Sequence, residues 1–250
     1  MKNFGLIGFP LSHSWSKIYF DQHLGIGKQS DYSYQLYELR HISEIRQLTE
    51  NQCLSGFNVT IPYKEQILPY LDQLTPEALS IGAVNCVKVA RRPDGRLHLL
   101  GHNTDCQAFL ETFTPLCEGT TLPKPLHALV LGKGGASKAV SFALNSLGIA
   151  HTCLSHIEID TLKQNHRLPE QTPSPISIVI NATPVGMYPH TDDNPFPLEH
   201  ITPPQIAYDL IYNPPLTRFL QECHHHGALT QNGLAMLHRQ AELSWQFWGI

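Results

Sequence analysis

The chain has 250 residues, of which 42% are hydrophobic and 15% are charged, and its formal net charge is −4. This length allows a large core and a division into two domains. The small negative charge provides no basic field, which argues against nucleic acid as the main partner.

Membrane and metal binding are also disfavoured. No apolar run is long enough to span a membrane, and the first residues lack the apolar segment of a signal peptide. The six cysteines are far apart and form no Cys-x-x-Cys pair, which favours reduced thiols over a disulfide framework or a metal site. The side chains of the histidine run 224–226 would point in different directions on a helix, so an exposed helix end is expected there. We therefore expect a cytoplasmic protein without membrane contact or metal.

Strands and helices alternate along the first half of the chain. The expected elements are strands at 4–8, 32–39 and 55–61 and helices at 18–24, 42–48 and 105–113. The segments 83–89 and 97–100 flank Pro93-Asp94-Gly95, which is typical of a β-hairpin. This order predicts a mainly parallel sheet with the hairpin at one side.

The second half begins with a glycine-rich turn. The apolar run 127–131 leads directly into Gly132-Lys133-Gly134-Gly135-Ala136, and apolar residues then recur at helical spacing until Gly148. Strand, tight turn and helix in this order favour binding of a diphosphate at the helix N-terminus over an ordinary turn. The remaining expected elements are strands at 151–154, 176–180 and 206–211 and a helix at 234–248. The fold class predicted for the whole chain is α/β.

Several polar residues of the first half lie at the ends of these elements, where open α/β sheets bind ligands. Ser14 and Ser16 precede a helix and suit a carboxylate, although serine there is more often only an N-cap. Lys64 lies in the first turn of a helix, against the helix dipole, which suggests a function. Asp105 could simply cap the next helix. Taken singly, each residue has an ordinary structural explanation.

Taken together, these residues resemble those of a known family. Eight motifs follow the order found in shikimate dehydrogenases, from Gly8 to Trp248. They are Ser-x-Ser at 14–16, Asn-Val-Thr-x-Pro-x-Lys at 58–64, Gly-Ala-Val-Asn at 82–85, Asn-Thr-Asp at 103–105, Gly-Lys-Gly-Gly-Ala-Ser-Lys at 132–138, Asn-Ala-Thr-Pro-Val-Gly-Met at 181–187, Tyr-Asp-Leu-Ile-Tyr-Asn-Pro at 208–214 and Gly-Leu-Ala-Met-Leu-His-Arg-Gln at 233–240. The resemblance implies an N-terminal α/β substrate domain of residues 1–104, joined by the C-terminal helix 234–250. It also implies a Rossmann-like NADP-binding domain of residues 105–233.

The resemblance further implies the reversible, NADP-dependent reduction of 3-dehydroshikimate to shikimate, with Lys64 and Asp105 as the catalytic pair. The chemistry agrees, because hydride addition to a ketone leaves an alkoxide that needs a proton and charge stabilisation. Lys64 can donate this proton, and Asp105 can position the lysine. The implied substrate ligands are Ser14, Ser16 and Tyr212 for the carboxylate and Thr60, Asn85 and Gln240 for the ring hydroxyls.

The same resemblance assigns the cofactor contacts. Those to the diphosphate are Gly132, Gly134, Gly135 and Ala136, and those to the nicotinamide are Thr183, Gly186, Met187 and Gly233. Members of this family usually carry an arginine after the second strand of the nucleotide domain, where this chain has Ser155 and His156, with neither arginine nor acid. Lys133 and Lys138 are other sources of positive charge. We therefore predict NADP, bound weakly with help from Ser155 and His156, rather than NAD.

Two alternatives remain open: an NAD-using quinate/shikimate dehydrogenase and a shikimate-binding protein with impaired turnover. The sequence does not distinguish a monomer from a homodimer.

Overall fold

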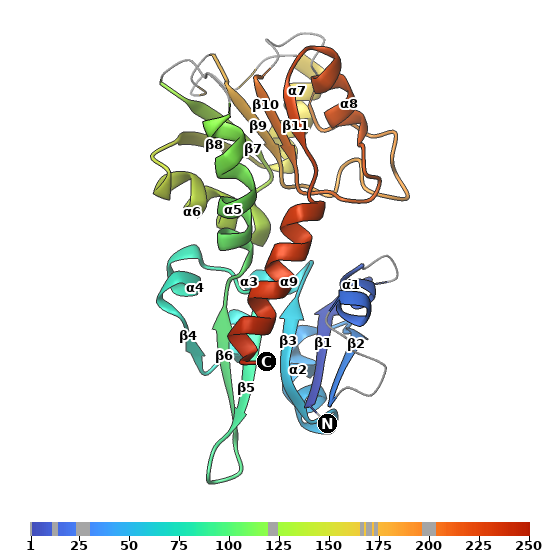
Figure 1. Ribbon diagram of the computed structural model, residues 1–250, viewed down its shortest axis with the longest axis vertical. Helices are drawn as coiled ribbons and strands as arrows, with labels where there is room; N and C mark the ends of the chain where they lie inside the picture. Colours follow the sequence, from blue (N-terminus) through green and yellow to red (C-terminus); the bar gives the residue numbers. More distant parts are fainter. Residues whose placement is uncertain are drawn as a thin grey trace. The chain divides into compact units, whose positions relative to one another are not determined.

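The computed structural model describes residues 2–11, 15–23, 31–119, 125–165, 168, 172, 175–196 and 204–250 (Figure 1). The chain divides into two compact units, one of Met1–Asp105 with His238–Ile250 and the other of Cys106–Leu237. Each unit has its own β-sheet with helices, so the predicted α/β class is confirmed. No described helix is long and apolar enough to cross a bilayer.

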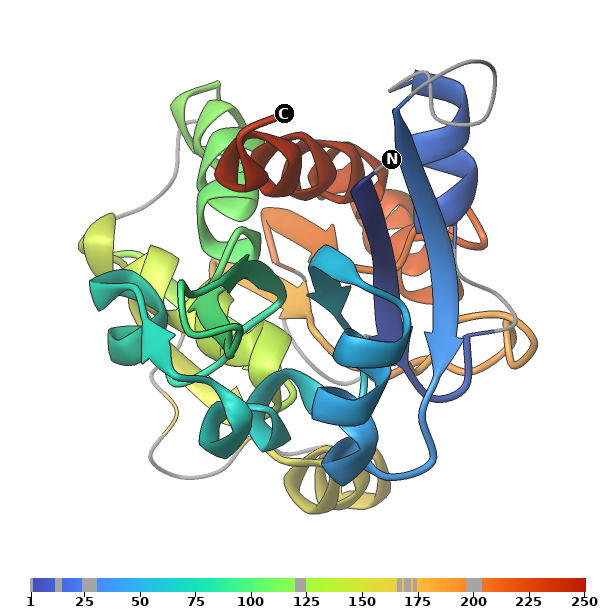
Figure 2. The same ribbon diagram turned by 90° about the horizontal axis from the view of Figure 1, so that it is seen from below.

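The first unit contains a six-stranded sheet in the order β2-β1-β3-β5-β6-β4. Its strands are β1 (Lys2–Gly8), β2 (Tyr32–Glu38), β3 (Leu54–Val59), β4 (Gln73–Leu74), β5 (Cys86–Arg91) and β6 (Leu97–His102). Its helices are α1 (Ser16–His23), α2 (Ile45–Asn51), α3 (Tyr63–Gln66) and α4 (Pro76–Ile81), with the 3-10 turns η1 (Ile42–Glu44) and η2 (Leu68–Tyr70). The helix α1 packs beside β1 and β2, as Figure 2 shows.

The expected hairpin is confirmed, and it lies on one side of the parallel strands β2, β1 and β3, with the short strand β4 beyond it. Strands β5 and β6 pair antiparallel, and Gly95 in their connection has a φ of 82°, which suits glycine. Strand β5 of the hairpin also pairs antiparallel with β3. Strand β6 also pairs parallel with β4. Strand β4 has only two residues, too few to produce a recognisable pattern.

The helix α9 (Leu234–Trp248) brings the end of the chain back to the first sheet. Trp248 is buried in a cluster with Phe4 and Leu6, and its indole Nε1 donates to the carbonyl oxygen of Val87 at 2.9 Å. A Cβ on Gly56 would lie 2.5 Å from this Nε1, so glycine is needed for the indole to pack this closely. Burial of an aromatic ring with its polar atom paired explains why this helix, from His238 onward, belongs to the first unit.

The second unit contains a five-stranded sheet in the order β11-β10-β9-β7-β8, in which each pair is parallel. Its strands are β7 (His127–Leu131), β8 (Ala150–Leu154), β9 (Ile178–Asn181), β10 (Ile206–Asp209) and β11 (Leu229–Gln231). The helices assigned to this part of the chain are α5 (Asp105–Glu118), α6 (Gly135–Ser146), α7 (His156–Asn165) and α8 (Arg218–His225). Every residue of β7 is buried, as expected for a central strand covered on both faces.

The strand order of this sheet reverses at β7, because the next strand in the chain, β8, lies on one side of β7 and β9 lies on the other. In open α/β sheets, ligands bind beside the carboxyl ends of the strands at such a switch point. The glycine-rich turn follows β7 directly, so the sheet topology places it where a ligand is expected.

Candidate active site

Lys64 and Asp105 form a short ion pair in the first unit. The Lys64 Nζ lies 2.6 Å from Asp105 Oδ2, and their side chains are 16% and 7% exposed. Lys64 is held by α3, which follows β3, and its carbonyl oxygen accepts from the Val84 N–H at 2.8 Å. Asp105 is the first residue of α5, after the strand β6. Two residues far apart in the sequence are thus joined in a largely buried ion pair.

Asn85 orients the carboxylate of Asp105 from the other side. Its Nδ2 donates to Asp105 Oδ1 at 2.8 Å, and its Oδ1 accepts from the Thr104 N–H at 2.7 Å. The Oε1 of Gln240 lies 3.5 Å from the same Nδ2. Both oxygens of Asp105 therefore have a donor, and the amides of Asn85 and Gln240 lie beside the ion pair.

A buried hydrogen-bond network attaches α9 to this centre. Asn58 Nδ2 donates to Ser244 Oγ at 2.8 Å, and Asn58 Oδ1 accepts from the Tyr34 hydroxyl at 3.0 Å. Ser244 Oγ in turn donates to the carbonyl oxygen of Gln240 at 2.8 Å. Residues four apart share one face of a helix, so fixing Ser244 also directs Gln240 toward Asn85. The sequence patterns indicated no role for Ser244 or Tyr34.

Two other predicted residues of this unit lie at the ends of secondary-structure elements. Ser16 is buried at the start of α1, and Thr60 is half-buried directly after β3. Ser14 lies outside the described residues. The structure therefore brings together Lys64, Asp105, Asn85 and Gln240.

The turn after β7 has the shape needed to hold a diphosphate. Gly132 has a φ of 115°, and Ser137 Oγ donates to its carbonyl oxygen at 2.6 Å, which closes the turn. Gly134 is the N-cap of α6 and has no side chain that could cap it. A Cβ on Gly134 would meet no described atom within 4 Å. Gly135 and Ala136 are in the first turn of α6, where the backbone N–H groups have no partner within the helix. Open space beside these N–H groups, at the positive end of the helix, fits a phosphate.

A buried carboxylate supports the neighbouring loop. Asp209 Oδ1 accepts from Asn181 Nδ2 at 3.0 Å, and Asn181 Oδ1 accepts from the Thr183 N–H at 3.0 Å and from its hydroxyl at 2.7 Å. Burial raises the pKa of Asp209 to about 7, against the opposing hydrogen bonds from Thr217, Ile211 and Asn181. Asp209 thereby fixes the start of the loop that carries Thr183, a residue expected to face the nicotinamide.

The other predicted residues of this unit follow the carboxyl ends of its strands. Gly186 is buried with a φ of 94°, and Met187 beside it is 37% exposed. Tyr212 is half-buried, three residues beyond the end of β10. A Cβ on Gly233 would overlap the carbonyl oxygen of Leu210, so only glycine allows this close approach of two backbone segments.

The stretch of residues 155–157 contains neither arginine nor acid, but the side chain of the next residue, Glu158, reaches back to the end of β8. The Oε2 of Glu158 accepts from the Ser155 N–H at 2.7 Å, from the Ser155 hydroxyl at 2.6 Å and from Lys133 Nζ at 2.8 Å. Lys133 and Ser155 together lower the pKa of Glu158 to about 2. Ser155 and Glu158 form a capping box at the start of α7, a Ser-x-x-Glu signal that is visible in the sequence. His156 is exposed in the first turn of α7.

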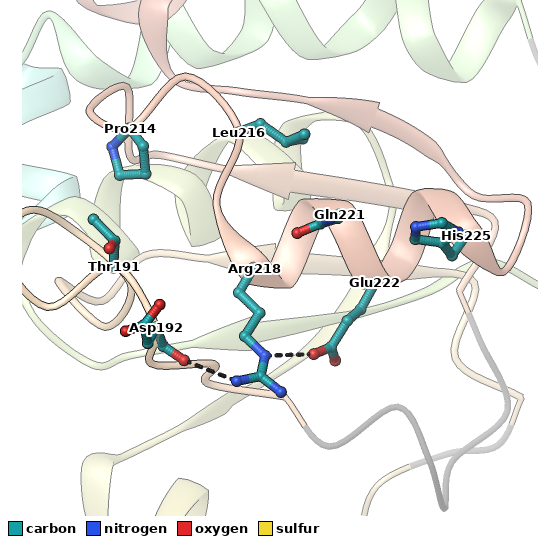
Figure 3. A pocket seen from close by; sticks show the side chains of 8 residues that line it. All are labelled: Thr191, Asp192, Pro214, Leu216, Arg218, Gln221, Glu222 and His225. Carbon is teal, nitrogen blue, oxygen red and sulfur yellow. Dashed lines mark hydrogen bonds and ion pairs between the residues drawn. The ribbon is translucent and has the colours of Figure 1, made fainter.

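A depression of about 460 Å³ lies beside α8 in the second unit (Figure 3). It is lined by Thr191, Asp192, Pro214, Leu216, Arg218, Gln221, Glu222 and His225. Arg218 Nε pairs with Glu222 Oε1 at 2.8 Å, so the arginine of this lining is held by one of its carboxylates. Since it contains none of the predicted site residues, we do not assign the chemistry to it. Among the described residues, no group of three His, Cys, Asp or Glu side chains could hold a metal ion.

A glycine turn at the switch point of a parallel sheet, with a buried lysine–aspartate pair in a second α/β unit, defines a two-domain α/β dehydrogenase. Comparison with known proteins identifies the family. The family model for the shikimate dehydrogenase substrate binding domain matches residues 6–87. The shikimate dehydrogenase (NADP(+)) of Methanococcus maripaludis strain C6 is 36% identical, over 99% of this chain and 91% of its own length.

A second relative and a solved structure agree. The shikimate dehydrogenase (NADP(+)) of Shouchella clausii is 34% identical, over 99% of this chain and 92% of its own length. The crystal structure of shikimate 5-dehydrogenase from Thermus thermophilus, in complex with NADP(H) and shikimate, superposes with a TM-score of 0.78 at 32% identity. That match covers 100% of this chain and 94% of the other. The chain belongs to the shikimate dehydrogenase family.

Proposed function

We propose that this protein is a shikimate dehydrogenase that reversibly reduces 3-dehydroshikimate to shikimate with NADPH. The observation that carries the proposal is the pair of Lys64 and Asp105, 2.6 Å apart, with Asn85 bound to the second carboxylate oxygen. Membership of the family indicates which substrate is bound. The ion pair can carry out the proton transfer that a ketone reduction requires.

In the reduction, Lys64 donates a proton from Nζ to the substrate's carbonyl oxygen. NADPH, when bound, supplies the hydride. Asp105 Oδ2 accepts a hydrogen bond from Lys64 and thereby directs the ammonium, while Asn85 prevents the carboxylate from rotating. In the reverse direction the same pair receives the proton of the hydroxyl. Low exposure of both side chains strengthens the electrostatic interaction with the reacting oxygen.

Substrate recognition is proposed to use two sets of side chains. Asn85 and Gln240 are amides beside the ion pair, and each offers donors and acceptors to ring hydroxyls, together with Thr60. A polar site of this kind rejects an analogue that lacks the matching hydroxyl, because its own groups would be left unpaired. The family resemblance assigns the carboxylate to Ser14, Ser16 and Tyr212.

The second unit is proposed to be the NADP domain, and the first the substrate domain. The turn of Gly132, Gly134, Gly135 and Ala136 would hold the diphosphate on the N-terminus of α6. The contacts proposed for the nicotinamide are Thr183, Gly186, Met187 and Gly233. Those proposed for the adenosine end are Ser155 and His156.

Steady-state kinetics with shikimate and quinate, each with NADP and with NAD, tests this function. We expect the highest kcat/KM with shikimate and NADP. A higher kcat/KM with quinate and NAD would indicate a quinate/shikimate dehydrogenase instead. Shikimate binding without turnover on either cofactor would indicate a binding protein.

We further propose that the enzyme acts in the cytoplasm, in aromatic amino-acid and chorismate biosynthesis. All six cysteines lie in the described part of the chain and are free thiols, which suits a reducing compartment. We propose a monomer or homodimer, and sedimentation equilibrium distinguishes the two.

A further inference from the structure

An ion pair connects two neighbouring β–α turns of the second unit. Strands β7 and β8 run parallel, with Leu131 opposite Leu154 at their carboxyl ends. Lys133 comes from the turn that follows β7, and Glu158 comes from the first turn of α7, directly after β8. The 2.8 Å contact between Lys133 Nζ and Glu158 Oε2 therefore bridges the two strand ends beside the glycine turn.

The Lys133–Glu158 pair lies where the adenosine ribose of a bound dinucleotide is expected. A dinucleotide whose diphosphate lies on the glycine turn places its adenosine ribose beside the end of the next strand. An acid there accepts a hydrogen bond from a 2′-hydroxyl, whereas a cation accommodates a 2′-phosphate. In this chain one group of each kind is present, and the two are bound to each other.

Both charges can be reached by a ligand. The side chain of Lys133 is 52% exposed, and that of Glu158 is 33% exposed. An ammonium has three N–H donors, so one hydrogen bond to Glu158 does not exhaust it. The Oε2 of Glu158 accepts from Ser155 and from Lys133, which keeps the carboxylate ionised and fixed at the strand end.

We propose that the Lys133–Glu158 pair sets the discrimination between NADP and NAD in this protein. Lys133 attracts a 2′-phosphate, and Glu158 opposes it by neutralising the ammonium and repelling the phosphate. The preference for NADP is consequently smaller than Lys133 alone would produce. This inference rests on the proposed function, because it requires a dinucleotide on the glycine turn.

Calorimetric titration of the full-length protein with NADP⁺ and with NAD⁺, without substrate, tests the pair by binding alone. Glu158→Gln removes the charge but keeps a side chain that can complete the capping box. We expect this variant to bind NADP⁺ about three- to tenfold more tightly, since one repulsive charge near a phosphate at the surface is removed. Its affinity for NAD⁺ should stay within about twofold.

Lys133→Met provides the reciprocal measurement. We expect it to weaken NADP⁺ binding by about tenfold and to leave NAD⁺ binding nearly unchanged. Glu222→Gln is the matched control, because it breaks a comparable ion pair with Arg218 on α8 in the same unit. This control should alter neither dissociation constant. Raising the salt concentration from about 50 to about 500 mM should reduce the effect of Glu158→Gln, because the repulsion is screened.

Two results would overturn the inference. Equal weakening of both nucleotides by Glu158→Gln would show that the charge of Glu158 supports the strand end and does not act on the 2′ position. An unchanged ratio of the two dissociation constants would show that the pair does not sense the 2′ position. If the unmodified protein bound neither nucleotide, the proposed function would fail together with the inference. Binding with an unchanged ratio would remove only the role of the pair.

Discussion

Asn85 donates from Nδ2 to Asp105 Oδ1 at 2.8 Å, on the side of the carboxylate opposite to Lys64. The same amide accepts through Oδ1 from the Thr104 N–H, so Asn85 cannot rotate without losing a bond at each end. Both Asn85 and Asp105 are buried. The geometry gives Asn85 a positioning role in addition to the substrate contact implied by the family.

Asn85→Ala should therefore reduce turnover as well as substrate binding. We expect kcat to fall by about tenfold, because Asp105 loses one of the donors that orient it. The free energy of unfolding should fall by about 1–3 kcal/mol, because buried polar groups are left unpaired. Steady-state kinetics and urea unfolding check these values. An increase in KM with unchanged kcat would instead assign Asn85 to substrate binding alone.

Lys64→Ala should lower kcat by about 10²- to 10⁴-fold, the usual contribution of a positioned proton donor. Shikimate affinity, measured by calorimetry, should change far less, because the hydroxyls and carboxylate of the substrate have other proposed ligands. Lys163→Ala, at an exposed position near the end of α7, is the control and should behave like the unmodified protein. Near-normal kcat in Lys64→Ala would remove Lys64 as the proton donor.

The parts of the fold that could be predicted from the sequence are those with strong local signals. The fully apolar run of β7 and the glycines after it identify a strand and a turn, and Gly95 identifies the hairpin. The short strands β4 and β11 have two and three residues, and they form only because a neighbouring strand offers hydrogen bonds. The helix α7 buries only Ile159 and Leu162, so its periodic pattern is weak.

The candidate site was less predictable than the fold. Lys64 and Asp105 were singled out by their motifs, because a separation of 41 residues carries no pattern of its own. The contact of Asn58 with Ser244 joins residues 186 apart, and hydrogen bonding between distant elements cannot be recognised in one sequence. Glu158 differs, since Ser-x-x-Glu before a helix is a local signal and could have been found.

Gly132 and Gly134 of the nucleotide turn should respond differently to alanine. At Gly134 a Cβ would meet no described atom within 4 Å, so the fold should tolerate it while the ligand should not. We expect Gly134→Ala to keep its melting temperature within about 2 °C and to weaken both nucleotides by about tenfold or more. Thermal unfolding and calorimetric titration check the two effects.

Gly132→Ala is the contrasting variant. Gly132 has a φ of 115°, and its Cβ would lie 3.1 Å from the Ala182 carbonyl oxygen. We expect a loss of about 1–3 kcal/mol in the free energy of unfolding, because alanine rarely adopts this conformation. Equal stability of the two variants would contradict the assignment of Gly132 to the fold and Gly134 to the ligand.

Asp209 should make the stability of the second unit depend on pH. Burial raises its pKa from 3.8 to about 7 in the folded protein, so the folded state holds this proton more tightly than the unfolded state. The resulting stabilisation is complete below the unfolded pKa and is lost as the pH rises through about 7. Between about pH 5 and pH 8 this carboxyl alone should lower the free energy of unfolding by about 2–3 kcal/mol.

Asp209→Asn should remove this dependence on pH. An asparagine amide can still accept from Asn181 and Ile211 and can donate to Thr217, so the loop should keep its conformation. Asp160→Asn, on the exposed face of α7, makes the same charge change and serves as the control. Urea unfolding should be followed by circular dichroism, with tryptophan fluorescence as a reference, because Trp15, Trp245 and Trp248 all belong to the first unit. If Asp209→Asn and the unmodified protein lost stability in parallel from about pH 5 to pH 8, the proton would not reside on Asp209.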